Sequence, residues 1–288
     1  MRLLARAFAV LVTSVTAAVP FAAAQAPTAA AAPTWAPAAT APVHPGVMTF
    51  TEGGQCTANF VFFDASNTVY IGQAAHCSGT GGATETNGCD SGSLPLGTEV
   101  EVDGASQPGV MVYNSWLAMQ AAGETNPDTC AFNDFALIRL NAADFAKVNP
   151  SIPFWGGPNG IDTNGTAAGE TVFSYGNSGL RLGISQLSPK QGVSLGDAGN
   201  GWSHNVYTAT PGIPGDSGSA FLNSTGAALG VLSTVQVAPL AGSNGVGDVN
   251  LELNYMRSHS SFSGVQLALG TQPFNSNILA NLLGSLGL

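Results

Sequence analysis

Short apolar runs of strand length, separated by turns rich in glycine, constrain the fold of this chain most. The 288 residues include 37 glycines and 17 prolines, and only 8% of them are charged. Such a chain is too apolar to be disordered, and its glycine content suits many short strands joined by tight turns. The sequence therefore predicts a mainly β protein.

Several segments have the pattern of β-strands. Residues 60–63 and 68–71 flank the turn-forming run Asp64-Ala65-Ser66-Asn67, so together they predict a hairpin. Residues 98–102 alternate polar and apolar side chains, as a half-buried strand does. The other predicted strands are residues 135–140, 170–175, 219–222 and 228–233.

The first 24 residues have the features of a secretory signal peptide. A basic start with Arg2 and Arg6 precedes an apolar stretch from Ala7 to Ala24, which ends in small residues suited to cleavage. Cleavage within Ala24-Gln25-Ala26 is an equally good alternative. A membrane-spanning helix is disfavoured because the stretch is short and rich in Ala and Thr. We expect a secreted, extracellular protein that has no membrane association once the signal is removed.

The rest of the chain divides into a linker and one large domain. Residues 25–45 are mostly Ala, Pro and Thr, which predicts a semi-extended linker or a short propeptide. Residues 46–288 form the domain, and a Pro- and Gly-rich join at about 149–160 separates its halves. Near the end, apolar residues at helical spacing predict a helix over about 275–286, capped by Asn275 or Ser276 and docked on the second half. The apolar residues of this helix are Ile278, Leu279, Leu282, Leu283 and Leu286.

The charge balance argues against a nucleic-acid partner. Without Arg2 and Arg6 the chain keeps five basic and seventeen acidic side chains, which gives a net charge of −12. A polyanion needs a basic surface, so we expect no nucleic-acid binding. The predicted terminal helix also lacks Lys and Arg on its polar face, which disfavours binding to a membrane surface.

The four cysteines point to disulfides. An even number of cysteines behind a signal peptide favours disulfide bonds, and three pairings are open. The chain has no Cys-x-x-Cys pair and no cluster of histidines, so we expect no metal site, and no motif calls for a cofactor. The cysteines are Cys56, Cys77, Cys89 and Cys130.

Three short runs carry chemistry. They are Ala74-Ala75-His76-Cys77, Asn133-Asp134-Phe135-Ala136-Leu137-Ile138 and Gly215-Asp216-Ser217-Gly218-Ser219-Ala220. Together, in the order His, Asp, Ser, they resemble the chymotrypsin-like (trypsin-fold) serine proteases, particularly the secreted bacterial branch. The resemblance implies two packed antiparallel six-stranded β-barrels, over about 46–148 and 149–270. It also implies a monomeric serine endopeptidase that cleaves protein or peptide substrates through an acyl-enzyme.

The resemblance assigns a role to each residue of the triad. A serine hydroxyl is a poor nucleophile at neutral pH and needs an adjacent base. His76 would take the proton from Ser217 and later give it to the leaving amine, while Asp134 would fix the tautomer of His76. The N–H groups of Gly215 and Ser217 would form the oxyanion hole, since glycines on both sides of the nucleophile allow the tight turn.

The resemblance also implies the disulfide pairing and the substrate pocket. The cysteine after the catalytic histidine would bond to one on the preceding strand, which gives Cys56–Cys77 and leaves Cys89–Cys130. Pro211, six residues before the nucleophile, would lie at the base of the pocket, where an Asp would select Lys or Arg. The following strand would form a pocket wall and pair with the substrate backbone, through Ser233, Thr234 and Val235. An apolar or small residue before the cut is therefore expected.

The chain departs from the animal members in how the nucleophile turn is supported. Ile213 stands where a disulfide cysteine would be, Ser219 replaces a glycine, and residues 44–47 supply no Ile-Val-Gly-Gly start. Asp216 would then need an internal cation, and the candidates are Arg139, Arg181 and Arg257.

Two other interpretations compete with an active enzyme. One is a protease-fold binding or surface protein that has lost turnover through a collapsed oxyanion turn or a filled pocket. The other is a secreted structural protein, which leaves the His–Asp–Ser order unexplained. His44, His204 and His259 lack a matching context and are interpreted as structural or surface residues.

Overall fold

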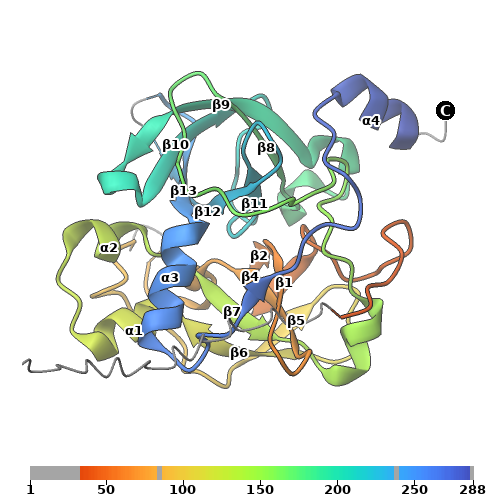
Figure 1. Ribbon diagram of the computed structural model, residues 1–288. Coiled ribbons are helices and arrows are strands. Elements are labelled where there is room, and N and C mark those ends of the chain that lie inside the picture. Colours follow the sequence, from red (N-terminus) through yellow and green to blue (C-terminus); the bar gives the residue numbers. More distant parts are fainter. Residues whose placement is uncertain (1–32, 83–85, 237–239, 286–288) are drawn as a thin grey trace, which may run out of the picture.

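The computed structural model describes residues 33–82, 86–236 and 240–285 (Figure 1). The predicted signal peptide, the first part of the linker and Leu286 lie outside these residues. Within them, no helix is both long enough and apolar enough to cross a membrane.

The N-terminal half of the domain is one curled sheet of eight strands, in the order β14-β3-β4-β7-β6-β5-β1-β2. All neighbouring strands pair antiparallel, and the sheet forms the lower layer in Figure 1. The strands are β1 Met48–Thr51, β2 Gly54–Thr57, β3 Val61–Phe63, β4 Val69–Gln73, β5 Glu99–Val102, β6 Gly109–Asn114, β7 Ala136–Arg139 and β14 Gln266–Leu267.

This sheet differs from the six-stranded barrel that was expected. Two features raise the number of strands from six to eight. The short strand β14 pairs with β3, and one bent segment is divided into the two strands β2 and β3. Only residues 58–60 separate β2, at one end of the sheet, from β3, next to the other end. Because one segment pairs with β1 at its start and with β4 at its end, the sheet must curl on itself.

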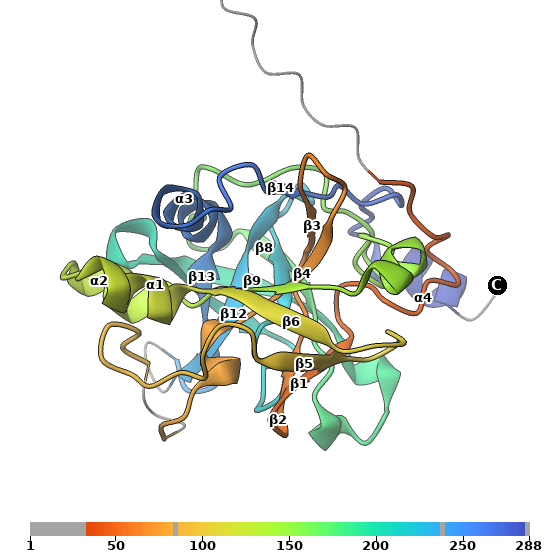
Figure 2. The same cartoon turned by 90° about the horizontal axis from the view of Figure 1, so that it is seen from below.

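The C-terminal half is a closed six-stranded barrel, as expected, in the order β10-β13-β12-β11-β8-β9. It forms the upper layer in Figure 1, and Figure 2 shows it behind the first sheet when the molecule is seen from below. Its strands are β8 Thr171–Tyr175, β9 Pro189–Ala198, β10 Ser203–Thr208, β11 Ala220–Leu222, β12 Ala228–Gln236 and β13 Ser243–Asp248.

All of the predicted strands are present, and the predicted hairpin pairs Val61 with Ile71. Strands β1, β2, β6, β9, β10, β13 and β14 were not predicted. Several of these are rich in glycine or polar residues, such as Ser243–Asp248, which is nevertheless fully buried. Their strand conformation depends on pairing with neighbours, and their own side-chain periodicity does not indicate it.

Among the described residues, four α-helices accompany the strands: α1 Ser115–Ala122, α2 Pro127–Phe132, α3 Val249–His259 and α4 Ile278–Ser285. Asn114 caps α1 and Asn126 caps α2 through their side-chain oxygens, and Asp248 caps α3. Helix α3 follows directly from β13 of the barrel and packs against α1 of the first half. It therefore links the two halves of the domain.

The described part of the expected linker packs against the first half of the domain. Trp35 packs edge-on against Phe63, with ring centroids 6.3 Å apart, and Val43 is fully buried beside Val148. Burial of large apolar side chains holds residues 33–45 on the domain despite their Ala- and Pro-rich composition.

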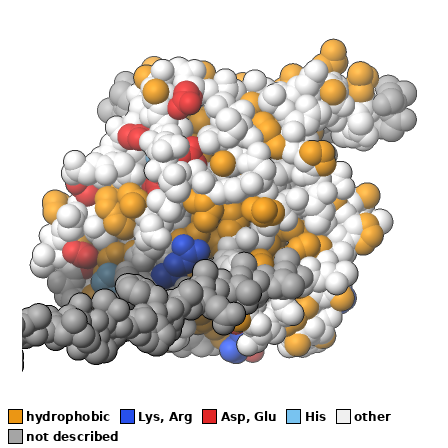
Figure 3. Space-filling view, in the orientation of Figure 1, with side chains coloured by type: hydrophobic (Ala, Val, Ile, Leu, Met, Phe, Trp, Pro, Cys, Tyr) orange, Lys and Arg blue, Asp and Glu red, His pale blue; other side chains and the backbone are white. Residues whose placement is uncertain are grey.

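The predicted terminal helix is present but is not docked through its apolar residues. Helix α4 begins at Ile278, and the Asn277 side chain accepts the N–H of Ala280, so neither Asn275 nor Ser276 is its cap. The side chains of Ile278, Leu279, Leu282 and Leu283 are 40–63% exposed, and Figure 3 shows orange side chains projecting there. The helical spacing of the apolar residues predicted the helix. That spacing does not determine whether another part of the protein packs against the apolar face.

Candidate active site

His76 is placed by a short 3₁₀ turn at the end of a buried strand. Strand β4 is buried throughout, and the turn Ala75–Ser78 follows it. A disulfide joins the next residue, Cys77, to Cys56 on β2. The turn is therefore anchored to two strands, which restricts the backbone that carries the imidazole.

Asp134 lies between α2 and β7 and holds His76 by two bonds. The Asp134 Oδ1 atom accepts the backbone N–H of His76 at 2.8 Å, and Oδ2 lies 2.6 Å from the imidazole Nδ1. The hydroxyl of Ser233, on β12, donates to the same Oδ2 at 2.5 Å. Residues from both halves therefore orient one carboxylate, and this carboxylate orients the ring.

The ionic environment favours the protonated form of His76. Burial lowers the pKa of His76, but the negative charge of Asp134 and its hydrogen bond to the ring outweigh burial and raise the pKa above its ordinary value of 6.5. An imidazole in this setting can take up a proton and keep it stabilised, which is the property required of a general base.

Ser217 faces the same cleft as His76. A cavity of about 670 Å³ runs between the two halves, and both residues line it together with Gly215, Ser233, Thr234 and Val235. Within the described residues, no hydrogen bond joins the Ser217 hydroxyl to His76. In proteins without bound substrate such bonds are often long and tighten only when substrate is present.

The turn around Ser217 leaves two backbone N–H groups without a hydrogen-bond acceptor among the described residues. In the described part of the chain, Asp216, Gly218 and Ser219 donate their N–H groups to backbone carbonyls, whereas the N–H groups of Gly215 and Ser217 have no protein acceptor. These two are the groups that the sequence resemblance assigned to the oxyanion hole. Gly218, with φ +89°, is required here because a Cβ would lie 2.4 Å from the Thr57 carbonyl oxygen.

Asp216 is buried and is neutralised inside the protein. Its Oδ2 atom lies 2.5 Å from the Arg181 guanidinium and 2.9 Å from the ammonium of Lys190, which is also fully buried. Burial raises the pKa of Asp216, but the hydrogen bond from Arg181 and the charge of Lys190 hold it below its ordinary value. Of the three arginines considered, Arg139 and Arg257 form no pair with it, and Lys190 was missed.

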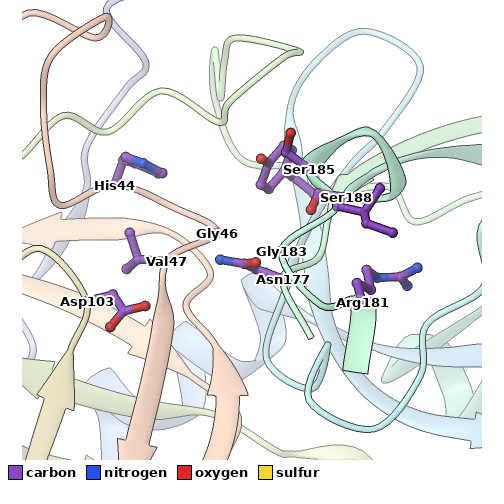
Figure 4. A pocket seen from close by; sticks show the side chains of 11 residues that line it. His44, Gly46, Val47, Asp103, Asn177, Arg181, Gly183, Ser185 and Ser188 are labelled. Carbon is purple, nitrogen blue, oxygen red and sulfur yellow. The ribbon is translucent and has the colours of Figure 1, made fainter. Parts of the chain in front are cut away.

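A second, smaller cavity of about 270 Å³ separates the start of the domain from this ion pair. Figure 4 shows His44 and Val47 on one side and Arg181 on the other, with the Arg181 side chain extending away from the cavity. The chain runs continuously through residues 33–47, and its Gly46 N–H donates to the Ala58 carbonyl. Asp216 is therefore paired without a free N-terminus.

The predicted pocket residues divide into two groups. Ser233, Thr234 and Val235 line the cavity next to Leu232 and Ile213. Pro211 is not among the lining residues: its carbonyl oxygen accepts a hydrogen bond from Arg181 at 3.1 Å, which draws it toward the buried ion pair.

A buried glutamate, which the sequence analysis did not single out, lies behind Asp134. Glu252 on α3 is fully buried, and its Oε1 atom accepts the backbone N–H of Asp134 at 3.1 Å. Burial disfavours the charged carboxylate and raises the pKa of Glu252 well above its ordinary value. No local motif marks it, because its role depends on where α3 packs.

The other histidines have structural surroundings. His204 is fully buried between Asp197, 2.7 Å from its Nδ1, and Asp248, 3.1 Å from its Nε2. His259 stacks on Tyr255 at 4.0 Å. His44 lines the smaller cavity, and its Nδ1 lies 2.8 Å from the Pro45 carbonyl oxygen.

The second disulfide joins Cys89 to Cys130, across 41 residues. It ties the loop after the His76 turn to α2, four residues before Asp134. Both disulfides have the pairing that the sequence resemblance implied.

Comparison with solved structures identifies the fold. The protease A of Thermobifida fusca superposes with a TM-score of 0.50, over 79% of this chain and 99% of that one, at 17% identity. The fold is chymotrypsin-like. A Nocardiopsis protease is 19% identical and covers 78% of this chain and 98% of its own, with a TM-score of 0.48. At these identities the likeness concerns the chymotrypsin-like fold alone.

Comparison of sequences does not identify a family. No family model matches the chain. Among curated proteins, a glucan 1,3-beta-glucosidase of Candida albicans is 34% identical over 106 residues, which is 34% of each protein. The chain thus spans about a third of the length of the curated relative it matches.

Proposed function

We propose that this chain is a serine endopeptidase in which Ser217 attacks the peptide carbonyl and forms an acyl-enzyme. His76 takes the serine proton and passes it to the leaving amine, and Asp134 holds the ring and stabilises the imidazolium. The N–H groups of Gly215 and Ser217 bind the oxyanion. The observation that carries this proposal is the contact of Asp134 with His76 at 2.6 Å, beside a cavity that Ser217 also lines.

The competing function, a binding protein of the same fold without turnover, predicts a collapsed oxyanion turn or a filled pocket. The N–H groups of Gly215 and Ser217 are free of protein acceptors within the described residues, and the cavity measures about 670 Å³. These two observations favour the enzyme.

The proposed activity is tested by covalent labelling. The folded protein is incubated with an organophosphate, and the adduct is mapped by mass spectrometry. We expect phosphorylation of Ser217 alone, because only a serine beside a working base and an oxyanion site reacts rapidly. Denatured protein is the control. An adduct-free Ser217 in the folded protein rules out the enzyme and leaves the binding protein.

We propose further that the pocket prefers an apolar or small residue before the cut. Ile213, Leu232 and Val235 line the cavity, and no acidic residue is among the described residues that line it. The fully buried Asn244 side chain hydrogen-bonds both Gly212 and Thr234. It therefore occupies space between the segment before Ser217 and strand β12. A basic side chain would find no carboxylate partner among those described residues.

This preference is measured by digesting a mixed peptide library and sequencing the products. We expect cleavage after small or apolar residues to exceed cleavage after Lys or Arg by at least about tenfold, the effect of about 1.4 kcal/mol. The same digestion without enzyme gives the background. Preferred cleavage after Lys or Arg contradicts the assignment of the pocket.

We also propose that the protein acts outside the cell on protein or peptide substrates. The two disulfides support this location, because such bonds persist in oxidising compartments. The monomeric state and the signal peptide stay predictions from the sequence.

A further inference from the structure

The direction of the Gly215 N–H depends on one peptide plane. Among the described residues, the Gly157–Pro158 bond is the only cis peptide, so the Pro214–Gly215 peptide is trans. In a trans peptide the carbonyl and the N–H point in opposite directions. The Gly215 N–H can therefore point into the cleft only while the Pro214 carbonyl points away from it.

A buried serine holds that carbonyl. The Ser178 hydroxyl donates to the Pro214 carbonyl oxygen at 2.6 Å. Ser178 is 1% exposed, and its own N–H donates to Asp216 Oδ1 at 3.0 Å. The hydroxyl also accepts the N–H of Leu180 at 3.1 Å, so the donor is itself oriented by its surroundings.

The next peptide of the turn is held by other side chains. The Gly215 carbonyl accepts the Thr57 hydroxyl at 2.8 Å and the Gln55 side-chain amide at 3.0 Å. Within the described residues, Ser178 is the only group that hydrogen-bonds the Pro214 carbonyl. The plane that aims the Gly215 N–H thus depends on this one hydroxyl.

Such a restraint is needed because the position is conformationally free. Gly215 has φ +94°, and glycine rotates between backbone conformations at little steric cost. Rotation of the Pro214–Gly215 peptide would turn a carbonyl oxygen toward the place where an oxyanion forms. That oxygen would repel the developing negative charge, and one donor would be lost.

We propose that Ser178 is a positioning residue that keeps the Gly215 N–H aimed into the cleft by holding the Pro214 carbonyl on the opposite side; this inference rests on the proposed function. Ser178 does not touch the reacting atoms. It acts through the peptide plane on the oxyanion site.

The test compares Ser178→Ala with Ser174→Ala. Ser174 is a matched control because it lies on nearby β8, is fully buried, and has a hydroxyl without a hydrogen-bond partner. Loss of one oxyanion donor lowers kcat by about 10²–10³-fold in known enzymes. For ester hydrolysis by Ser178→Ala we expect a fall of kcat of about 10–10²-fold, smaller because the donor is loosened and not removed. KM and the activity of Ser174→Ala should stay within about twofold of wild type.

A spectroscopic readout separates positioning from loss of stability. The carbonyl stretch of an isotope-labelled acyl-enzyme, measured by infrared spectroscopy, should move to higher frequency in Ser178→Ala, because weaker hydrogen bonds polarise the carbonyl less. Ser178→Cys occupies nearly the same space with a weak donor, and it should show the same shift even where the alanine variant folds poorly.

The outcomes distinguish this inference from the function on which it rests. An active wild type whose kcat and carbonyl frequency are unchanged in both Ser178 variants overturns the role of Ser178 alone. A wild type that forms no acyl-enzyme on Ser217 overturns the enzyme and, with it, the role of Ser178.

Discussion

Replacing Ser217 with alanine is expected to lower kcat for peptide hydrolysis by about 10⁶-fold, the loss found when the catalytic serine is removed from a protease with a Ser-His-Asp triad. The remaining groups would still bind substrate and the oxyanion, so a residual rate about 10³–10⁴-fold above the uncatalysed reaction should persist. KM should change little, because the hydroxyl acts in the chemical step.

The fold should survive this change. In the described structure the Ser217 side chain makes no hydrogen bond, while its backbone carbonyl accepts the Thr57 N–H at 2.8 Å and is unaffected by the substitution. Thermal unfolding and circular dichroism check this point, and Ser258→Ala, on α3 outside the cleft, serves as the matched control. Activity above about 1% of wild type in Ser217→Ala would mean that another residue is the nucleophile.

Replacing Asp216 with asparagine is expected to produce the largest loss of stability. Breaking a buried ion pair from one side costs about 3–5 kcal/mol, because the partner charge is left uncompensated. Here two cations lose their partner. The side chain of Lys190 is fully buried, and that of Arg181 is 9% exposed. For a domain of this size that loss corresponds to a fall in Tm on the order of 10 °C.

Activity should fall with stability in Asp216→Asn, since the carboxylate also accepts the N–H groups of Ser178 and Ile213 and so supports the nucleophile turn. The control is the double variant Asp216→Asn with Lys190→Met, which removes one stranded charge. It should be more stable than Asp216→Asn alone. A double variant that is less stable than the single one contradicts the account of uncompensated charge.

The pH dependence of this effect has a defined sign. The pKa of Asp216 is lower in the folded chain than its ordinary value of 3.8. Its stabilisation is therefore complete above that value and is lost as the pH falls through the folded-state pKa. Denaturant unfolding of wild type and Asp216→Asn should show the largest difference at neutral pH and a shrinking difference in acid.

These two variants examine separate parts of one turn. Ser217→Ala removes the reacting atom and leaves the support intact, whereas Asp216→Asn leaves the hydroxyl and removes the support. If both variants lose activity and only Asp216→Asn loses stability, the turn around Ser217 is preformed in the folded protein. Because Asp216 is paired with Arg181 and Lys190, we expect the full-length domain to be active without cleavage before Val47.

Much of the site could be recognised from local sequence because its parts are local. The runs at His76, Asp134 and Ser217 each combine a candidate catalytic side chain with the turn or strand that presents it. Alternation likewise marked Glu99–Val102, where side-chain burial alternates along the strand. An apolar run marked Ala136–Arg139, where the first three residues are buried.

Other features could not be read in this way because they arise between distant segments. Lys190 meets Asp216 only after β9 takes its place in the barrel, and Glu252 reaches the Asp134 N–H, 118 residues away, only because α3 packs beside the cleft. The family resemblance placed Pro211 at the base of the pocket, yet its carbonyl oxygen accepts a hydrogen bond from Arg181. Helix α4 formed as its spacing indicated, but no apposed surface covers it among the described residues.

The sequence by itself determined the local elements, the three short runs around His76, Asp134 and Ser217 and the presence of disulfides, because backbone propensity and side-chain chemistry act over a few residues. Only the tertiary structure decided how Asp216 is neutralised, which carboxyl supports Asp134 and which hydroxyl holds the Pro214 carbonyl. Those contacts depend on strand register and helix packing, and a shift of one residue in register would bring different side chains together.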